Sequence, residues 1–302
     1  MSVGSTYRSA PLLLNLERDE TTGEFGLAST WCNLGAWPVE EHARRRTSFR
    51  HACKSLATLV GESAKLSPGD AVLDVGVGYA DQTAIWKETF GVNQVIALEP
   101  SAEHVAAAQK AQDEGRLPSA DDVKIRVGSA DSVSAFADTC GAGFDAIICL
   151  DCAYHFRTRA AFLRRAVPLL RPGGRFAAAD LTLGPSRGRS VSFISRLIRC
   201  AAQRAVAAMC DIPSGNLQTT CGYAASLEAA GLQDVSIEPL SAGGNDRVLR
   251  PFALHVEQQR KALRGQLRGP EAVLLWVISS LFTWISRYEL FTFVLVSAAK
   301  PQ

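Results

Sequence analysis

Residues 72–82, "VLDVGVGYADQ", join a strand-like apolar run to a turn that contains two glycines. Glycine has no Cβ and tolerates positive φ, so a turn of this kind lets the backbone approach a bound ligand closely. Dinucleotide-binding turns follow the pattern GxGxxG or GxGxxA, which with Gly76 and Gly78 requires a small residue at position 81. That position holds Asp81, and the small residue is instead Ala80. The turn therefore predicts a ligand other than a dinucleotide.

This turn belongs to a segment in which short β-rich runs alternate with helical patterns. Strands are expected at 71–75, 94–99, 123–127, 144–150 and 174–181, and two later ones at 234–240 and 290–298. Alternation of this kind predicts a parallel sheet with helices on both faces. Such sheets bind ligands at the carboxyl ends of their strands, and each motif described below falls at such an end.

The rest of the chain is interpreted as a set of elaborations of one domain. Residues 1–70 are expected to form an N-terminal lid with helices, residues 71–182 the ligand-binding core, and residues 183–302 helical cap insertions with the last strands of the same sheet. No internal repeat or low-complexity linker separates these segments. The predicted fold class is therefore α/β, a doubly wound, mostly parallel seven-stranded sheet with an N-terminal helical lid and a helical cap insertion.

The composition narrows the classes of function. The chain has 302 residues, of which 47% are hydrophobic, and its net charge of +2 gives no general attraction for nucleic acid. Eight scattered cysteines and the lack of a secretory pattern at the N-terminus predict a reduced, cytoplasmic compartment. Cys149 and Cys152 form a CxxC without a second pair of ligands, so they are interpreted as small residues at a strand end. No metal site is expected.

The glycine turn is one of four motifs that follow one another in order. It reads D-x-G-x-G-x-A from Asp74 and resembles the first motif of the class I S-adenosylmethionine-dependent methyltransferases, (D or E)-x-G-x-G-x-G, with Ala80 in place of the third glycine. Glu99 ends the second strand, "FDAIICLDCAYHF" (144–156) matches the fourth-strand motif, and "LLRPGGRFAAAD" (169–180) matches the turn into the fifth strand. The resemblance covers about 110 residues and implies the methyltransferase fold, with S-adenosylmethionine as cofactor.

The resemblance also implies a set of cofactor contacts. The glycine turn would lie against the methionine part of the cofactor. Glu99 would accept hydrogen bonds from both ribose hydroxyls, a task that suits a carboxylate because it has two acceptor oxygens. Ser129 stands at the position of the adenine contact, and Asp131 follows two residues later. The expected cofactor-binding residues are Asp74, Gly76, Gly78, Glu99, Pro100, Ser129, Ala130, Asp131 and Leu150.

One of the five histidines lies at the carboxyl end of an expected strand. His51 and His104 fall within helical patterns and are expected to serve packing or the surface. His155 follows the fourth strand by about five residues, and "DCAYHF" resembles a segment of small-molecule O-methyltransferases from natural-product pathways. That resemblance implies that His155 is a general base for a hydroxyl acceptor and that Asp180 is its partner.

The residues leave other chemistries open. The acceptor atom could instead be nitrogen or carbon, and a carbocation formed on carbon calls for aromatic and carboxylate groups, for which Tyr154 and Tyr79 are candidates. The expected catalytic residues are therefore His155, Asp180 and Tyr154. A non-methylating cyclase or isomerase on the same fold is a further alternative. A binding protein with an inactive site is another, although the intact glycine turn and Glu99 argue against it.

Segments outside the core bear on the acceptor. Four aromatic residues lie where this family places the cap over the acceptor site: Phe193, Trp276, Phe282 and Trp284. An apolar cap implies a lipophilic small-molecule acceptor, unless these rings form the cap's own core. "NLGAW" (33–37) resembles the loop "NLGYW" that closes over cofactor and substrate in the family.

Two segments raise the hypothesis of membrane contact. Residues 185–204 hold five arginines and no acid, and their helical pattern places Val191, Ile194, Ile198, Ala201 and Ala205 on one face. This predicts either a solvated arginine face over a core or contact with an anionic membrane surface. The apolar run 272–285 is shorter than the roughly 20 residues that a bilayer requires, so it predicts a buried lid helix or an interfacial helix. The expected partners are a small-molecule acceptor, no nucleic acid, and a membrane surface at 185–204 and 272–285.

Overall fold

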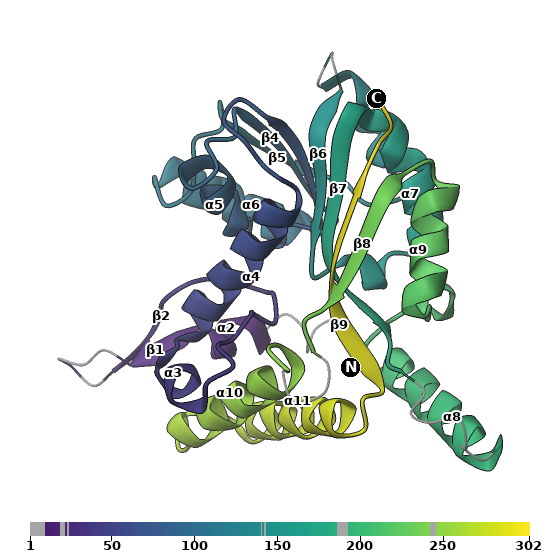
Figure 1. The fold of residues 1–302 in the computed structure, drawn as a ribbon. Coiled ribbons are helices and arrows are strands. Elements are labelled where there is room, and N and C mark those ends of the chain that lie inside the picture. The colour runs from purple at the N-terminus through teal and green to yellow at the C-terminus, as the bar shows by residue number, and fades with distance from the viewer. Residues whose placement is uncertain are drawn as a thin grey trace. The chain divides into compact units, whose positions relative to one another are not determined.

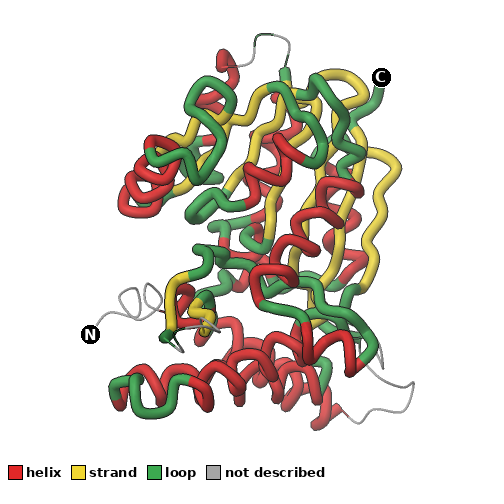
Figure 2. Tube along the Cα trace, turned by 90° about the vertical axis from the view of Figure 1, so that its left-hand side faces the viewer, coloured by secondary structure: helices red, strands yellow, loops and turns green. Residues whose placement is uncertain are grey.

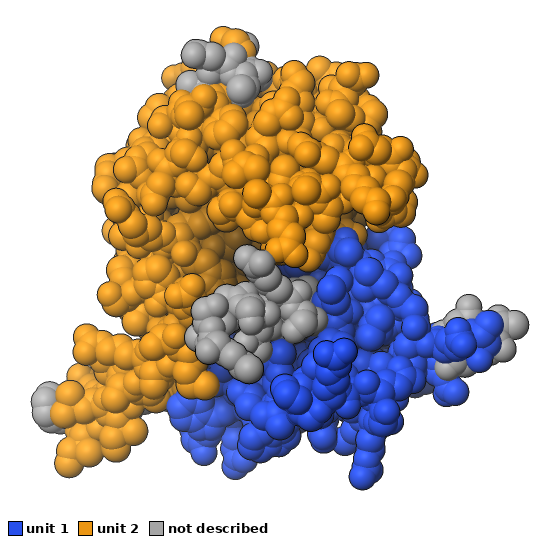
Figure 3. Space-filling model, turned by 180° about the vertical axis from the view of Figure 1, so that it is seen from behind, with its two compact units in different colours: residues 1–56, 240–288 blue, residues 57–239, 289–302 orange. Residues whose placement is uncertain are grey.

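The computed structural model describes residues 10–18, 22, 24–139, 141, 143–185, 193–241 and 246–302. The chain divides into two compact units, which Figure 3 shows in blue and orange. Unit 1 comprises residues 1–56 and 240–288, and unit 2 comprises residues 57–239 and 289–302. The division into a lid (1–70), a core (71–182) and a cap (183–302) concerns function and stays a prediction.

Unit 2 is built on one seven-stranded sheet. Its strands are β3 (Ala71–Val75), β4 (Gln94–Glu99), β5 (Val123–Val127), β6 (Phe144–Leu150), β7 (Leu170–Leu183), β8 (Gln233–Pro239) and β9 (Phe291–Ala299). Their order is β5-β4-β3-β6-β7-β9-β8. The first five pair in parallel, and β9 is antiparallel to both of its neighbours. The predicted fold class, a mostly parallel seven-stranded sheet, is confirmed.

Helices cover both faces of this sheet (Figures 1 and 2). They are α5 (Gln82–Glu88), α6 (Ala102–Asp113), α7 (Arg159–Ala166) and α9 (Thr220–Ala229), with short 3-10 helices at Val133–Thr139, Ala153–His155, Val167–Leu169 and Ser214–Asn216. Helix α8 (Phe193–Met209) instead extends away from the sheet (Figure 1). Helix α4 (Phe49–Ser63) has residues in both units. Because side chains alternate along a strand, β3 directs Leu73 and Val75 into the core shared with α7 and α9, and Asp74 to the opposite face.

Unit 1 is mainly helical. It contains α2 (Ala10–Leu14), α3 (Glu41–Arg46), α10 (Leu249–Ala262) and α11 (Gly269–Arg287), with a two-stranded sheet of β1 (Leu16–Arg18) and β2 (Phe25–Leu27). Trp37 of the "NLGAW" loop is buried in this unit, with its ring near Phe49 and His255. Its indole nitrogen donates to the carbonyl of Leu34 at 3.0 Å. Trp37 is therefore a core residue of unit 1.

Helix α8 exposes its apolar side. Ile194, Leu197 and Ile198 are exposed, whereas the opposite side makes the contacts with unit 2. There the side chain of Gln203 donates to the carbonyl of Leu290 at 2.8 Å, and Arg199 donates to the carbonyl of Glu289. The carbonyls of Glu289 and Leu290, just before β9, need hydrogen-bond donors, and the polar side of α8 supplies them where its apolar side could not. The prediction of a solvated arginine face over a core is therefore wrong for the described part of this segment. Arg187, Arg189 and Val191 lie outside the described residues.

Helix α11 also differs from the expected lid. It has 19 residues, and of the described helices it alone is long and apolar enough to cross a bilayer by length and composition, a weak criterion that core helices also meet. Only 17% of its most apolar window is buried. Trp276 and Trp284 are exposed, and Phe282 packs edge-on against Phe252 at 4.9 Å between ring centroids. The side chain of Phe193 is outside the described residues.

Candidate active site

The carboxyl ends of the parallel strands bring the glycine turn next to β4. Val75 pairs with Leu98 in the parallel ladder, so Gly76 follows at the level where β4 ends. The amides of Gly76 and Val77 both donate to the carbonyl of Leu98, at 2.7 and 3.1 Å. The turn is thereby held against the end of the neighbouring strand, at the edge where such sheets bind ligands.

Positive φ angles explain the small residues of the turn. Gly76 has φ +81°, Gly78 +57° and Ala80 +66°. Ala80 therefore occupies the left-handed region in which the family's pattern has glycine, a conformation that costs an L-residue about 1–2 kcal/mol. A Cβ on Gly76 would also lie 2.7 Å from the sulfur of Cys152. Gly76 is thus required both for its φ and for the space that the thiol occupies.

The two CxxC thiols pack against this turn. Cys149 is fully buried in β6, and the thiol of Cys152 donates to the carbonyl of Val75 at 3.0 Å. Burial raises the pKa of Cys149. The hydrogen bond with the Cys149 thiol, together with burial, raises the pKa of Cys152 well above its ordinary value. Both groups therefore stay protonated thiols. Among the described residues, no cluster of three or more His, Cys, Asp or Glu is arranged to hold a metal.

Asp74 lies beneath the turn rather than on its open side. Its carboxylate is fully buried and accepts a hydrogen bond from the indole of Trp86 at 2.8 Å. Its other oxygen, Oδ1, has no hydrogen-bond partner within the described structure. Burial raises the pKa of Asp74 to about 7, against the opposing effects of Trp86 and Gln82. In this structure Asp74 connects β3 to α5, and a direct contact with cofactor stays a prediction.

Glu99 lies beside the glycine turn and is held by two backbone amides, while its contact with ribose stays a prediction. One oxygen accepts from the amide of Gly78 at 2.9 Å, and the other from the amide of Ser101 at 3.1 Å. A carboxylate offers about four lone-pair sites, so fixing it by two backbone amides leaves acceptor capacity for neighbouring hydroxyls. Its place beside the glycine turn, with the side chain about 10% exposed, fits the nucleoside of S-adenosylmethionine.

His104 lies at this site, although its helical pattern predicted a packing or surface role. Helix α6 begins directly after Glu99, with Ser101 as its N-cap, and its first turn carries His104 back towards the carboxylate. The Nδ1 atom of His104 lies 3.3 Å from Oε1 of Glu99, and its ring lies 4.4 Å from that of Tyr79. The sequence held one indication of this place: His104 stands three residues after the N-cap of the helix that follows Glu99, the acid expected to bind ribose.

The expected adenine residues lie after β5, in a loop stabilised by its own hydrogen bonds. The amide of Ser129 donates to the hydroxyl of Ser132 at 3.0 Å, and Ala130 is buried. Asp131 is exposed and forms an ion pair with Arg165 of α7 at 2.9 Å. At the ends of their strands, Pro100 is exposed and Leu150 is buried. Their cofactor contacts stay predictions.

The turn after β6 carries two of the three expected catalytic residues, Tyr154 and His155. Asp151 has φ +58°, and its carboxylate accepts a hydrogen bond from the hydroxyl of Tyr154 at 2.8 Å. The rings of Tyr154 and His155 are 4.3 Å apart. The Nδ1 atom of His155 lies 3.2 Å from the main-chain oxygen of Asp211. Tyr154 and His155 are therefore neighbours at the carboxyl end of β6, each held by a different aspartate residue.

The contact with Asp211 fixes the proton arrangement of His155. A carbonyl oxygen can only accept, so in the neutral ring Nδ1 donates and Nε2 has a free lone pair. Surrounding protein atoms disfavour the charged form and lower the pKa of His155, while the Asp211 carbonyl opposes this shift. The side chain is nevertheless exposed. His155 is thus a neutral imidazole near neutral pH with Nε2 able to accept a proton.

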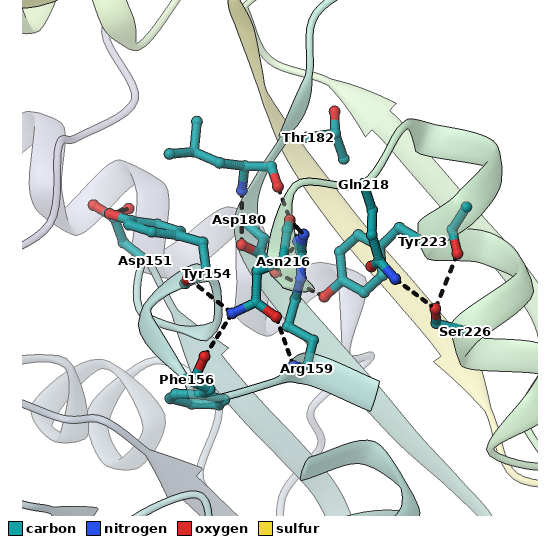
Figure 4. Close-up of polar contacts among 12 residues, drawn as sticks. Asp151, Tyr154, Phe156, Arg159, Asp180, Thr182, Asn216, Gln218, Tyr223 and Ser226 are labelled. Atoms are coloured by element: carbon teal, nitrogen blue, oxygen red, sulfur yellow. Dashed lines mark hydrogen bonds and ion pairs between the residues drawn. The ribbon is translucent and has the colours of Figure 1, made fainter. Parts of the chain in front are cut away.

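Asp180 does not contact His155, in contrast to the expected pairing. Side chains alternate along β7, so Asp180 lies on the same face as Phe176 and Ala178, under α7 and α9. Its carboxylate accepts from Arg159 at 3.0 Å and from the hydroxyl of Tyr223 at 2.8 Å, as Figure 4 shows. All three side chains are buried. The orienting contact expected from Asp180 is made instead by the backbone of residue 211.

Asn216 is a second residue that the sequence did not reveal. Its amide donates to the carbonyls of Tyr154 and Phe156, at 3.0 and 2.6 Å, and its Oδ1 accepts from the amide of Arg159 at 2.8 Å (Figure 4). Its carbonyl also accepts from the Arg159 guanidinium. Asn216 therefore fixes both sides of the turn that carries His155. Nothing in "SGN" (214–216) signals this role, because its partners lie about sixty residues away in the chain.

Comparison with known proteins finds similarity to methyltransferases. Residues 73–178 match a family model described as a methyltransferase domain. The chain is 28% identical over 222 residues to erythromycin 3''-O-methyltransferase of Saccharopolyspora erythraea, covering 74% of this chain and 67% of that protein. It is 28% identical over 269 residues to 27-O-demethylrifamycin SV methyltransferase of Amycolatopsis mediterranei, covering 88% and 89%.

Solved structures share the fold. The cyclopropane synthase MmaA2 from Mycobacterium tuberculosis superposes with a TM-score of 0.69 at 20% identity, covering 97% of this chain and 95% of that one. The [4+2]-cyclase SpnF gives a TM-score of 0.64 at 18% identity, covering 90% and 87%. Geranyl diphosphate C-methyltransferase from Streptomyces coelicolor gives 0.63 at 16% identity, covering 99% and 100%. At these identities the likeness is one of fold.

The space beside Gly76 gives a first prediction. We expect Gly76→Val to abolish detectable binding of S-adenosylhomocysteine in calorimetry, because any Cβ there meets the Cys152 thiol. Gly69→Ala is the matched control: Gly69 has φ +94° with no atom within 4 Å, so this change adds strain alone. Ala80→Gly should leave binding nearly unchanged. Equal losses in the Gly69 and Gly76 variants would show that the space beside Cys152 is not decisive.

The raised pKa of Asp74 predicts a pH-dependent stability. The protonated carboxyl stabilises the folded state at low pH, and this stability is lost as the pH rises from about 4 through about 7. Asp74→Asn should therefore raise the free energy of unfolding by about 4 kcal/mol at pH 8, and by less as the pH falls. Urea denaturation between pH 5 and pH 8 measures this, with the exposed Asp113→Asn as control. A gain that does not vary with pH would contradict the proposed cause.

The buried ion pair of Asp180 gives a third prediction. Asp180→Asn leaves the Arg159 charge buried without its counter-ion, so we expect a loss of about 3–5 kcal/mol in the free energy of unfolding. Tyr223→Phe removes one hydrogen bond and should lose only about 1–3 kcal/mol. The fall of turnover at acid pH should move to lower pH in Asp180→Asn and stay in place in Tyr223→Phe, because the Asp180 charge raises the pKa of His155 without contacting it. A shifted pH profile with unchanged stability would instead make Asp180 the partner of His155.

Proposed function

The chain is an S-adenosylmethionine-dependent methyltransferase, and we propose that it methylates a hydroxyl oxygen of a small, lipophilic, natural-product-like acceptor. The observation that carries the choice of oxygen is the contact of His155 Nδ1 with the Asp211 carbonyl. It leaves Nε2 as a proton acceptor at the carboxyl end of β6. A hydroxyl is the acceptor group that gains most from such a base, by about 10²–10⁴-fold.

Residues around the glycine turn would hold the cofactor. When bound, S-adenosylmethionine supplies an electrophilic methyl group on a sulfonium. Glu99, fixed by the amides of Gly78 and Ser101, would accept hydrogen bonds from the ribose hydroxyls. The backbone from Gly76 to Gly78 would lie along the methionine part, and the loop after β5 along adenine. Asp74 supports the turn from below through Trp86.

His155 and its neighbours would then act on the acceptor. Nε2 of His155 takes the hydroxyl proton as the oxygen attacks, and the Asp211 carbonyl stabilises the imidazolium that forms. Asn216 and the ion pair of Arg159 with Asp180 keep the turn that carries His155 in place. Positioning of this kind can supply roughly 7–11 kcal/mol of the barrier reduction. The aromatic ring of Tyr154 beside this base favours an apolar acceptor.

The relatives favour oxygen, and one observation favours a second candidate. Erythromycin 3''-O-methyltransferase carries the acceptor atom in its name. Against this, the phenol of Tyr154 is held by the Asp151 carboxylate, and an aromatic ring with a carboxylate is what a carbocation needs. Carbon methylation of a terpenoid or lipid is therefore the second candidate. Nitrogen methylation and a non-methylating cyclisation or isomerisation are further alternatives. The identity of the labelled product in the experiment described below separates them.

Replacement of His155 tests the proposed base. We expect His155→Ala to lower kcat by about 10²–10⁴-fold while S-adenosylhomocysteine binds as before, since the cofactor residues are untouched. In the unchanged protein, kcat should fall as the pH drops through the lowered pKa of His155, because the imidazolium accepts no proton. Turnover within a few-fold of the unchanged protein would remove His155 from the mechanism. A large loss in Tyr154→Phe with none in His155→Ala would favour carbon.

The acceptor can be identified by the labelled methyl group that it receives. The purified protein, methyl-labelled S-adenosylmethionine and a lipophilic extract of the native host are combined, and the labelled product is identified by mass spectrometry and NMR. O-methylation predicts one added methyl group on oxygen and an equal amount of S-adenosylhomocysteine. A product with no added methyl and no S-adenosylhomocysteine would show a non-methylating reaction.

A further inference from the structure

Helix α11 presents an aromatic and aliphatic stripe to solvent, interrupted by the exposed Ser280 and Thr283. Val273, Trp276, Val277, Trp284 and Tyr288 are 58%, 56%, 36%, 40% and 53% exposed. Trp276 and Val277 follow Val273 by three and four residues, Trp284 follows Val277 by seven and Tyr288 follows Trp284 by four, which places them on one side of a helix. Large apolar side chains gathered on one exposed face mark an interaction surface more often than chance.

The other side of α11 holds it to unit 1. Leu275, Ser279 and Ile285 are its buried residues. The hydroxyl of Ser279 donates to the carbonyl of Ala253 on α10 at 3.0 Å, and that of Ser286 donates to Asp246 at 2.7 Å. A helix that spans a bilayer would have to abandon these contacts. The geometry therefore fits a helix that lies along a surface.

The exposed residue types favour a lipid surface over an aqueous partner. Tryptophan and tyrosine combine an apolar ring with a polar group, and both are enriched where head groups meet acyl chains. Between residues 272 and 286 the helix has no charged residue, which suits insertion of this face below the head groups. Arg287 follows that uncharged run directly, and Glu271 precedes it, three residues after Arg268.

The surroundings of the stripe are basic. Residues 249–288 contain six arginine or lysine residues and two acids. A pocket of about 430 Å³ opens beside the stripe, between α10 and α11. Arg287, Ser280 and Thr283 are among its lining residues, next to the rings of Trp276, Trp284 and Tyr288. Arg260 also lines it and is paired with Glu257 of the same lining at 2.8 Å. Arg287 and the two hydroxyls beside aromatic rings match an anionic head group above an acyl chain.

We propose that α11 docks the protein onto an anionic lipid bilayer, with Trp276, Trp284 and Tyr288 in the head-group layer and Arg264, Arg268 and Arg287 near lipid phosphates. The evidence for docking comes from the surface of unit 1 alone. The purpose that we assign to it, taking a lipophilic acceptor from the bilayer, rests on the proposed function. Charge complementarity should make the binding weaker at high salt.

Tryptophan fluorescence tests this directly. The other three tryptophans, Trp31, Trp37 and Trp86, are buried, so a change in emission on adding vesicles reports Trp276 and Trp284. The full chain is titrated with vesicles of equal parts phosphatidylcholine and phosphatidylglycerol, and with phosphatidylcholine alone. We expect a blue shift and co-sedimentation with the anionic vesicles at low salt. No shift and no co-sedimentation would overturn the proposal.

Variants locate the contact. Trp276→Ser with Trp284→Ser should weaken binding by more than about tenfold, as should replacement of Arg264, Arg268 and Arg287 by Gln. Ile194→Ser with Ile198→Ser on α8 is the matched control, since it removes two exposed apolar side chains elsewhere and should leave binding unchanged. Near-ultraviolet circular dichroism and S-adenosylhomocysteine affinity verify that each variant is folded.

Two further outcomes would overturn the proposal. If the α8 variant loses binding and the α11 variants keep it, the docking surface is on α8. If light scattering shows a dimer that the double tryptophan variant dissociates, a second copy of the chain covers the stripe. Vesicle binding needs neither cofactor nor acceptor, so vesicle binding without methyl transfer would contradict the proposed function and leave the docking supported.

Discussion

The buried ion pair between Arg159 and Asp180 is the interaction on which the order of the candidate site depends. It joins the end of β7 to the start of α7, and Tyr223 extends it to α9. Through Arg159 and Asn216 it also reaches the turn that carries Tyr154 and His155. A charge in such a place is stable only with its partner, so the network has one arrangement rather than several. The packing of the core therefore determines the geometry of the site.

Much of the sheet could be predicted because β3, β4 and β6 are buried on both faces and read as nearly continuous apolar runs. In β5 the apolar residues Val123 and Ile125 alternate with Lys124 and Arg126, a pattern that also predicts a strand. The strands at 71–75, 94–99, 123–127 and 144–150 have the predicted bounds. The glycine turn was equally legible, since positive φ and close approach leave few residue types to choose from. Glu99 could be expected at this edge because its position follows from the end of a strand.

The contacts within the site could not be predicted in the same way. Asp180 occupies its expected position, but the side on which a strand residue faces decides its partners, and the helices on that side supply Arg159 and Tyr223. His104 and Asn216 act through chain segments whose proximity the pattern does not encode. For α8, helical periodicity predicted an apolar face, and for α11 the uninterrupted apolar run predicted a lid or interfacial helix. Neither pattern revealed that the apolar side of each helix is exposed, because that depends on which side of the helix bonds to the rest of its unit.

The contact between His155 and the main-chain oxygen of Asp211 has a consequence for how this enzyme can evolve. Every residue type has a carbonyl, so a substitution at 211 does not delete the group that orients the histidine. Residue 211 has φ +54°, which restricts the tolerated replacements mainly to Asn and Gly. A change in loop length between α8 and Pro213 is different, since it would carry the carbonyl out of reach. Natural variation at this point should therefore be seen in residue identity and rarely in insertions or deletions.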